Sequence, residues 1–163
     1  MAWIVRPISR SLACFMVLLA LMTQLSACNM LQDAQYPTIC FVLPDGYRGA
    51  FQLVLDNKEG VGIVTKDGQY VYEIPVSGVL KVKSFKPFEG LHKEIAVYKN
   101  GESILTDDTT LSPSTIALRS LGTSRRNKGP YIQTNVIGTQ EEAKQAKIDE
   151  MAGTLKLGKP RLP

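Results

Sequence analysis

Short runs in which every second residue is apolar recur between Thr38 and Ile137, and this alternation constrains the fold more than any other feature of the chain. Period-two alternation places successive side chains on opposite faces of a β-strand. Glycine-containing turn dipeptides separate the apolar runs, and Asp67-Gly68 is the clearest hairpin reversal. Strands are expected at 39–43, 51–55, 70–74, 80–82, 94–98, 101–105, 115–121 and 131–137. We therefore expect an all-β domain at residues 38–137, built as a small antiparallel β-sandwich or as a barrel-like sheet.

One short helix is expected after the strands. Thr139 is followed three positions later by Glu142, which is the spacing of a capping box, and Gly153 can end the helix. Its apolar face would consist of Ala143, Ala146 and Met151. Because this face is thin, we expect the helix to dock loosely and the chain from residue 155 to form a flexible tail, so that 138–163 is a C-terminal helix and tail.

The N-terminus has the pattern of an export signal. Arg6 and Arg10 precede the uninterrupted apolar run 12–22, and no acidic residue interrupts this part of the chain. Eleven helical residues span roughly 16 Å, well short of the ~30 Å hydrocarbon core of a bilayer. This length favours a cleaved signal over an uncleaved anchor, which is the alternative. Without the two arginines the formal charge falls from +4 to +2, and no nucleic-acid-binding pattern is present.

The four residues Leu25-Ser26-Ala27-Cys28 resemble the lipobox of bacterial lipoproteins. The resemblance implies that a lipid is attached to the thiol of Cys28 and that the chain is cut between Ala27 and Cys28. Residues 1–27 would then be a lipoprotein signal peptide and 28–37 a lipidated tether, held in a bacterial envelope membrane by acyl chains. The residue after the lipobox cysteine is Asn29, and not the aspartate that resembles an inner-membrane retention signal in enteric-type lipoproteins. In a Gram-negative host, the periplasmic face of the outer membrane is therefore expected.

No catalytic or metal-binding arrangement is indicated by the sequence. His92 is the only histidine, so a surface or turn position is expected for it. Asp107 and Asp108 lack the spacing of a calcium-binding loop and are typical of a turn. A basic cluster, which could bind an anion but is favoured as a solvated loop, consists of Arg125, Arg126 and Lys128. We expect a protein that is not an enzyme and that has no cofactor apart from the covalent lipid.

Cys40 lies in a run that is apolar on both faces of the expected strand. We therefore expect its thiol to be buried in the core or against a partner sheet. Because the sulfur of Cys28 would carry lipid, Cys40 has no expected partner within the chain. An intermolecular disulfide is the alternative.

Two further segments resemble a family of uncharacterised bacterial envelope β domains. They are Phe41-Val42-Leu43-Pro44-Asp45-Gly46-Tyr47-Arg48-Gly49 and Tyr70-Val71-Tyr72-Glu73-Ile74-Pro75-Val76-Ser77-Gly78-Val79. The resemblance covers about residues 39–105 and implies a fold rather than a reaction. Its structural turn residues are Pro44, Gly46, Gly49, Pro75 and Gly78.

These observations lead to three hypotheses about function. The favoured one is a lipid-anchored envelope protein whose β domain is a non-enzymatic module that binds a protein or a cell-wall component. The second is an inhibitor or immunity-type protein that blocks an envelope-targeting enzyme. The third is a hydrolase that uses carboxylates dispersed in the sequence.

Overall fold

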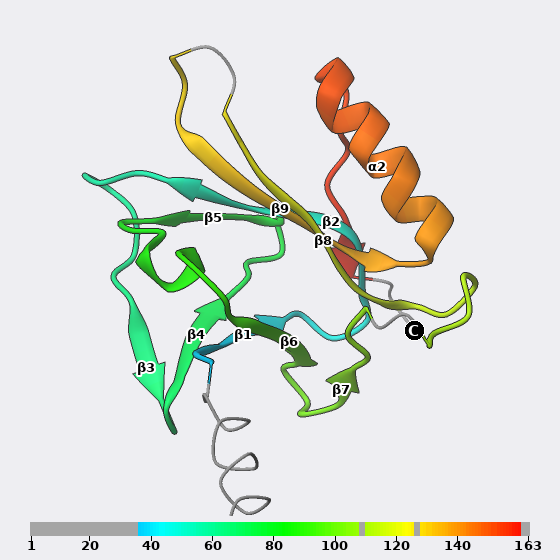
Figure 1. Cartoon of the computed structure of the whole chain (residues 1–163), viewed down its shortest axis with the longest axis horizontal. Helices are drawn as coiled ribbons and strands as arrows, with labels where there is room; N and C mark the ends of the chain where they lie inside the picture. The colour runs from blue at the N-terminus through cyan, green and yellow to red at the C-terminus, as the bar shows by residue number, and fades with distance from the viewer. Residues whose placement is uncertain (1–35, 108–109, 126–127, 161–163) are drawn as a thin grey trace, which may run out of the picture. The chain divides into compact units, whose positions relative to one another are not determined.

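The computed structural model describes residues 36–107, 110–125 and 128–160, which form a mostly β structure with one helix near its C-terminal end (Figure 1). Ala27 and Cys28 lie outside the described residues, as do the signal segment and most of the expected tether. The strands are β1 (Thr38–Leu43), β2 (Tyr47–Leu55), β3 (Val64–Lys66), β4 (Gln69–Glu73), β5 (Val79–Val82), β6 (Lys93–Tyr98), β7 (Ser103–Ile104), β8 (Ala117–Arg125), β9 (Tyr131–Gly138) and β10 (Lys159–Pro160). The helix is α2 (Gln140–Ala152), and a 3-10 turn, η2, spans Lys86–Phe88. The expected all-β class with a C-terminal helix is confirmed.

The first sheet has the order β3-β4-β1-β6-β7. β1 lies at its centre and runs parallel to both β4 and β6. β3 and β4 form the expected hairpin, and both turn residues, Asp67 and Gly68, have positive φ angles of 50° and 75°. Two positive φ angles match the right-handed twist of the paired strands.

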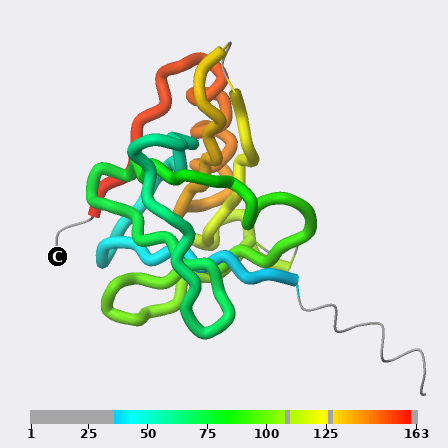
Figure 2. Tube along the Cα trace, turned by 90° about the vertical axis from the view of Figure 1, so that its left-hand side faces the viewer, coloured from blue at the N-terminus to red at the C-terminus, as the bar shows by residue number. Residues whose placement is uncertain are grey.

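The second sheet has the order β10-β2-β9-β8, and β5 pairs with β2 in parallel. β8 and β9 form a long antiparallel hairpin that rises beside α2 in both views (Figures 1 and 2). The expectation of purely antiparallel sheets is wrong, since both sheets are mixed. The chain crosses to the second sheet between β1 and β4 and again between β4 and β6, so it re-enters the first sheet in the same direction.

The core lies between the two sheets and is formed by the inward residues of alternating strands. β1 contributes Ile39, Phe41 and Leu43, and β2 contributes Phe51 and Leu53, all fully buried. The rings of Phe41 and Phe51 meet edge to face with centroids 5.2 Å apart. Period-two burial along these strands is the physical basis of the alternation seen in the sequence.

Helix α2 covers the outer face of the second sheet, opposite the core. Thr139 caps its start through a complete capping box, and Gly153 ends it with a φ of 80°. Ala143 is buried against Ala50 and Val136, as the expected apolar face requires. The prediction that Met151 belongs to that face is wrong, because Met151 is 77% exposed. Its neighbour Glu150 is buried in its stead.

The segment after the helix is an ordered part of the fold rather than the expected flexible tail. The amide of Gly158 donates a 2.7 Å hydrogen bond to the carbonyl of Ala50, and β10 pairs antiparallel with the start of β2. A Cβ atom at Gly49 would stand 2.7 Å from the Cα of Gly158. Glycine at both positions therefore allows the two backbones to touch. Residues 161–163 lie outside the described part.

Candidate functional site

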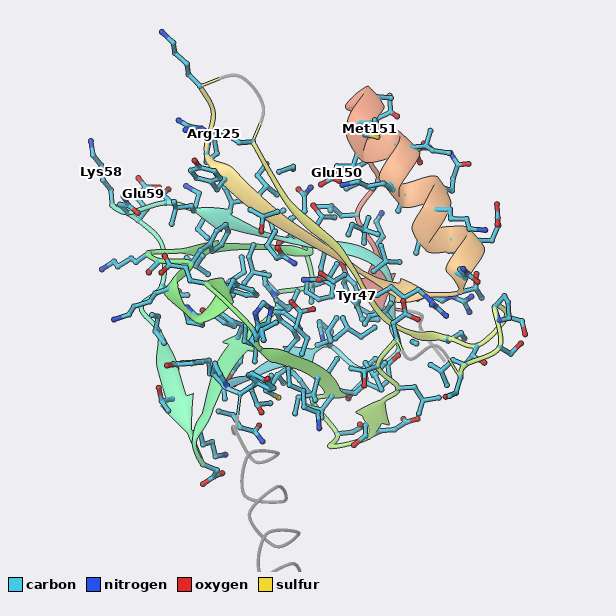
Figure 3. The ribbon with its side chains drawn as sticks, in the orientation of Figure 1. Tyr47, Lys58, Glu59, Arg125, Glu150 and Met151 are labelled. Carbon is cyan, nitrogen blue, oxygen red and sulfur yellow. The ribbon has the colours of Figure 1, made fainter. Side chains whose placement is uncertain are left out.

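The two motif segments meet at the side chain of Tyr47, the first residue of β2, which is buried inside the fold (Figure 3). Its hydroxyl donates a 2.8 Å hydrogen bond to the carbonyl of Ala50, and burial raises its pKa to about 12. A Cβ atom at Gly78 would collide with this hydroxyl. The large side chain of Tyr47 on one segment thus requires a glycine at residue 78 on the other.

The predicted turn residues surround this contact. The amide of Tyr47 donates to the carbonyl of Pro44 at 3.0 Å, and the amide of Gly78 donates to the carbonyl of Pro75 at 2.9 Å. Positive φ angles occur at Gly46 (65°), Gly49 (107°) and Gly78 (75°). This arrangement shapes the backbone and provides no group that could react with a ligand.

The polar cluster around the only histidine lies at the amino end of β6. Nε2 of His92 is 3.3 Å from Oε1 of Glu94, and its Nδ1 is 3.0 Å from the carbonyl of Gly90. Its ring packs edge to face on Phe88 with centroids 5.7 Å apart. Burial raises the pKa of Glu94, although hydrogen bonds from His92 and Ser120 oppose the shift.

A cleft of about 380 Å³ opens beside this cluster and is lined by His92, Lys93, Glu94, Thr106, Asp107, Leu118 and Ser120. Its titratable groups are mostly engaged with one another. Ser120 is bonded to Glu94 and to Gln133 rather than to His92, and Asp107 forms an ion pair with the buried guanidinium of Arg119. A nucleophile bonded to a histidine base is therefore not assembled among the described residues of this cleft.

The other residues of interest from the sequence do not converge. Asp107 serves Arg119, and Asp108 lies outside the described residues. The guanidinium of Arg125 lies 4.8 Å from the ring centroid of Tyr131, and its Nε donates to the carbonyl of Gly129. Lys128 is exposed, while Arg126 is outside the described residues. The basic cluster thus presents Arg125 as a stacking partner of an aromatic ring.

Cys40 is 7% exposed, which confirms its predicted burial, and it forms no disulfide with another described residue of the chain. Burial raises the pKa of its thiol, so the reactive thiolate is disfavoured. In register with Val71 and Ile95, it lies in the centre of the first sheet.

A second cleft, of about 360 Å³, lies near the turn end of the β8–β9 hairpin, where Tyr131 begins β9, and is called here the Tyr131 cleft. It is lined by Leu55, Asn57, Lys83, Ser84, Phe85, Glu89 and Tyr131. Although Arg125 stacks on its ring, Tyr131 is 45% exposed, so part of the ring is accessible beside the apolar side chains of Leu55 and Phe85. Within the described part of the chain, the side chains of Asn57, Lys83 and Glu89 make no hydrogen bond or ion pair with the protein. These three side chains can therefore bond to a ligand.

The main chain around the Tyr131 cleft is already paired. Lys81 and Lys83 of the β5 segment exchange 2.9 Å hydrogen bonds with Val61, and the carbonyl of Val82 accepts from Asp56. Among the described residues, these segments therefore leave no free strand edge beside the cleft that a peptide could extend. A ligand in this cleft would have to be held by side chains, which supply an ammonium donor, a carboxylate acceptor and an amide that does both.

Sequence reasoning missed the Tyr131 cleft because its polar residues come from segments that are far apart in the chain. Asn57 follows β2, Lys83 follows β5, and Glu89 ends the 3-10 turn. Each is an ordinary polar loop residue in the sequence, and only the fold brings them together. The exposed Tyr131 at the start of a strand is the one local signal of the cleft.

Two further observations concern the described residues as a whole. None of their helices has both the length and the apolar character needed to cross a membrane. Among the same residues, no three His, Cys, Asp or Glu side chains are grouped in a way that could hold a metal ion.

Comparison with known proteins gives little similarity. No protein-family model and no curated protein matches the chain. Among solved structures, a chain described as "Putative Lipoprotein from Bacillus anthracis" is 13% identical and superposes with a TM-score of 0.45, over 71% of this chain and 93% of the other. The resemblance of the two motif segments to an envelope β-domain family stays a prediction from their residues.

Proposed function

We propose that the chain is a bacterial envelope lipoprotein whose β domain binds an envelope component without catalysing a reaction. The anchor is supported by the sequence Leu25-Ser26-Ala27-Cys28 after a short apolar run. Thr38, the start of β1, follows Cys28 by ten positions, and an extended chain over that interval reaches about 35 Å. The domain would work close to the membrane. In a Gram-negative host this would be the periplasmic face of the outer membrane.

The observation that carries the binding role is the contrast between the two clefts. His92, Glu94 and Ser120 in the first cleft are bonded to each other, whereas the side chains of Asn57, Lys83 and Glu89 around Tyr131 have no partner among the described residues. A half-exposed aromatic ring flanked by such groups suits a ligand with one apolar face and several hydroxyls. Cell-wall glycan has this chemistry, and it is the ligand class that we favour.

Metabolic labelling tests the anchor. Wild-type cells fed a fatty-acid analogue should yield labelled protein that begins at Cys28, as read from its intact mass. Cys28→Ala should carry no label and should keep its signal, because lipid transfer needs a thiol. Cys14→Ala is the matched control and should behave as the wild type. Label that persists in Cys28→Ala would contradict the lipoprotein proposal.

Sedimentation with purified cell walls tests the binding role. The wild-type chain should pellet with the walls, and Tyr131→Ala should pellet several-fold less, because it removes the aromatic surface of the cleft. Met151→Ala is the control, since Met151 is 77% exposed on α2 and lies outside the cleft. Equal pelleting of all three proteins, or none by the wild type, would contradict glycan binding at this site.

A further inference from the structure

The parallel pairing of the first sheet brings the starts of three strands together at one end of the sheet. Thr38 of β1 is in register with Gln69 of β4 and with Lys93 of β6. The amide of Lys93 also donates a 3.0 Å hydrogen bond to the carbonyl of Pro37. Figure 1 shows the start of β1 near the turn between β3 and β4. Residues that precede these strands therefore gather where the chain enters the domain.

This end of the sheet, where β1, β4 and β6 begin, is called here the tether edge, and it combines exposed apolar and basic side chains. It consists of Tyr36, Lys66, Leu91 and Lys93. Leu91 is 72% exposed and Tyr36 is 52% exposed, and both lysines are exposed as well. Asp67 in the β3–β4 turn is the acidic residue closest in sequence to Lys66. Amphipathic aromatic, aliphatic and lysine side chains are the combination that the surface of an anionic bilayer favours.

Chain length limits how far this edge can move from a lipidated cysteine. Tyr36 follows Cys28 by eight positions, and an extended chain over that interval reaches at most about 29 Å. The opposite end of the sheet stands roughly 17–20 Å farther along strands of five to six residues. This step rests on the proposed lipid anchor. It makes the tether edge the end of the sheet that the bilayer meets first.

We propose that the tether edge is a membrane-contact surface that holds the domain upright on an anionic bilayer. Tyr36 and Leu91 enter the headgroup region, and Lys66 and Lys93 lie over lipid phosphates. The strands of the first sheet then point away from the membrane. Val76, which follows the far end of β4 and is 64% exposed, faces the aqueous side.

The mature chain offers a clean optical test because the only tryptophan of the sequence, Trp3, precedes Cys28. The lipidated protein is placed in vesicles of phosphatidylethanolamine and phosphatidylglycerol that contain brominated acyl chains. Leu91→Trp and Val76→Trp each introduce one fluorophore at an exposed apolar position, at opposite ends of the sheet. We expect brominated lipid to quench Leu91→Trp several-fold more than Val76→Trp. Equal quenching, or the reverse order, would overturn the proposal.

A second comparison tests the role of charge. Replacing both lysines, Lys66→Gln with Lys93→Gln, should lower the quenching of Leu91→Trp on anionic vesicles and leave it unchanged on uncharged phosphatidylcholine. Quenching that is unaffected on anionic vesicles would refute the assignment to an anionic surface. Tyr36→Trp gives a second reporter at the same edge, should Leu91→Trp fail to fold.

The anchor and the contact surface can fail separately. Intact mass shows whether Cys28 carries lipid, and a mass without lipid contradicts the proposed function. In that case Cys28 is coupled to a maleimide lipid, and the same quenching comparison still decides the contact surface. A lipidated protein with equal quenching at both reporters keeps the anchor and rejects the surface.

Discussion

The contact between Tyr47 and Gly78 predicts a measurable coupling between the two motif segments. Gly78→Ala places a Cβ atom on the Tyr47 hydroxyl at a φ of 75°. The left-handed backbone alone costs an alanine about 1–2 kcal/mol, and the steric overlap adds to this. Tyr47→Phe removes the hydroxyl and its buried 2.8 Å hydrogen bond to Ala50, at a cost of about 1 kcal/mol. The carbonyl of Ala50 keeps its bond from the Gly158 amide, so it is not left unpaired.

The double variant should be less destabilised than the sum of the two single changes. Without the hydroxyl, the alanine Cβ loses its closest collision partner, so the backbone strain at residue 78 and a tight 3.3 Å contact with the Cβ of Leu157 remain. We expect a coupling of at least about 0.5 kcal/mol in the free energy of unfolding, which is above the level at which independent sites add. Urea unfolding followed by circular dichroism measures all four proteins of the cycle. Additivity within about 0.3–0.5 kcal/mol would refute the idea that the hydroxyl excludes a side chain at residue 78.

Three further changes test other parts of the fold. Gly49→Val combines a φ of 107° with a Cβ atom 2.7 Å from the Cα of Gly158, so we expect the free energy of unfolding to fall by about 3 kcal/mol or more. An unchanged urea midpoint would contradict this contact. Deleting residues 158–163 removes β10 and should lower the melting temperature, whereas a freely mobile tail could be removed without effect. Burial raises the pKa of Glu150, but hydrogen bonds from Lys147 and Thr134 outweigh it and leave the pKa below its usual range. The stability gained from this lowered pKa is therefore present above about pH 4.3 and is lost as the pH falls through the folded-state pKa of Glu150. Glu150→Gln should be less stable than the wild type at pH 7 and should lack this acid-dependent loss of stability. Urea unfolding measured between pH 2 and 7 tests both expectations.

The sequence predicted the strands and their turns well because local patterns determine them. The β3–β4 hairpin is confirmed down to the two positive φ angles at Asp67 and Gly68. Parallel pairing could not be foreseen, since a period of two is the same in parallel and antiparallel strands. The formation of β10 as a strand was also not predicted. Its docking depends on the approach of Gly158 to Gly49, which joins residues distant in sequence.

The candidate site was less predictable than the fold for a related reason. A catalytic motif depends on spacing within one segment, whereas the Tyr131 cleft is built from loops that follow different strands. The burial of Cys40 could be predicted from the apolar residues on either side of it in the sequence, without knowledge of contacts to distant segments. Glu150 shows the opposite case. A glutamate in a polar helix is expected to be solvated, but Thr134 and Ser124 on the hairpin below bind it.

The pairing of β2 with β10 also determines when the domain can finish folding. Tyr47 and Arg48, near the start of the domain, find their partners only at Lys159 and Pro160. Contacts of such long sequence separation slow folding, because the loop between them must close before the contacts form. If the chain leaves an export channel with its N-terminus first, as the proposed signal segment implies, it cannot complete its second sheet until Pro160 has emerged. On that proposal, the second sheet is still incomplete while the residues before β10 pass through the channel.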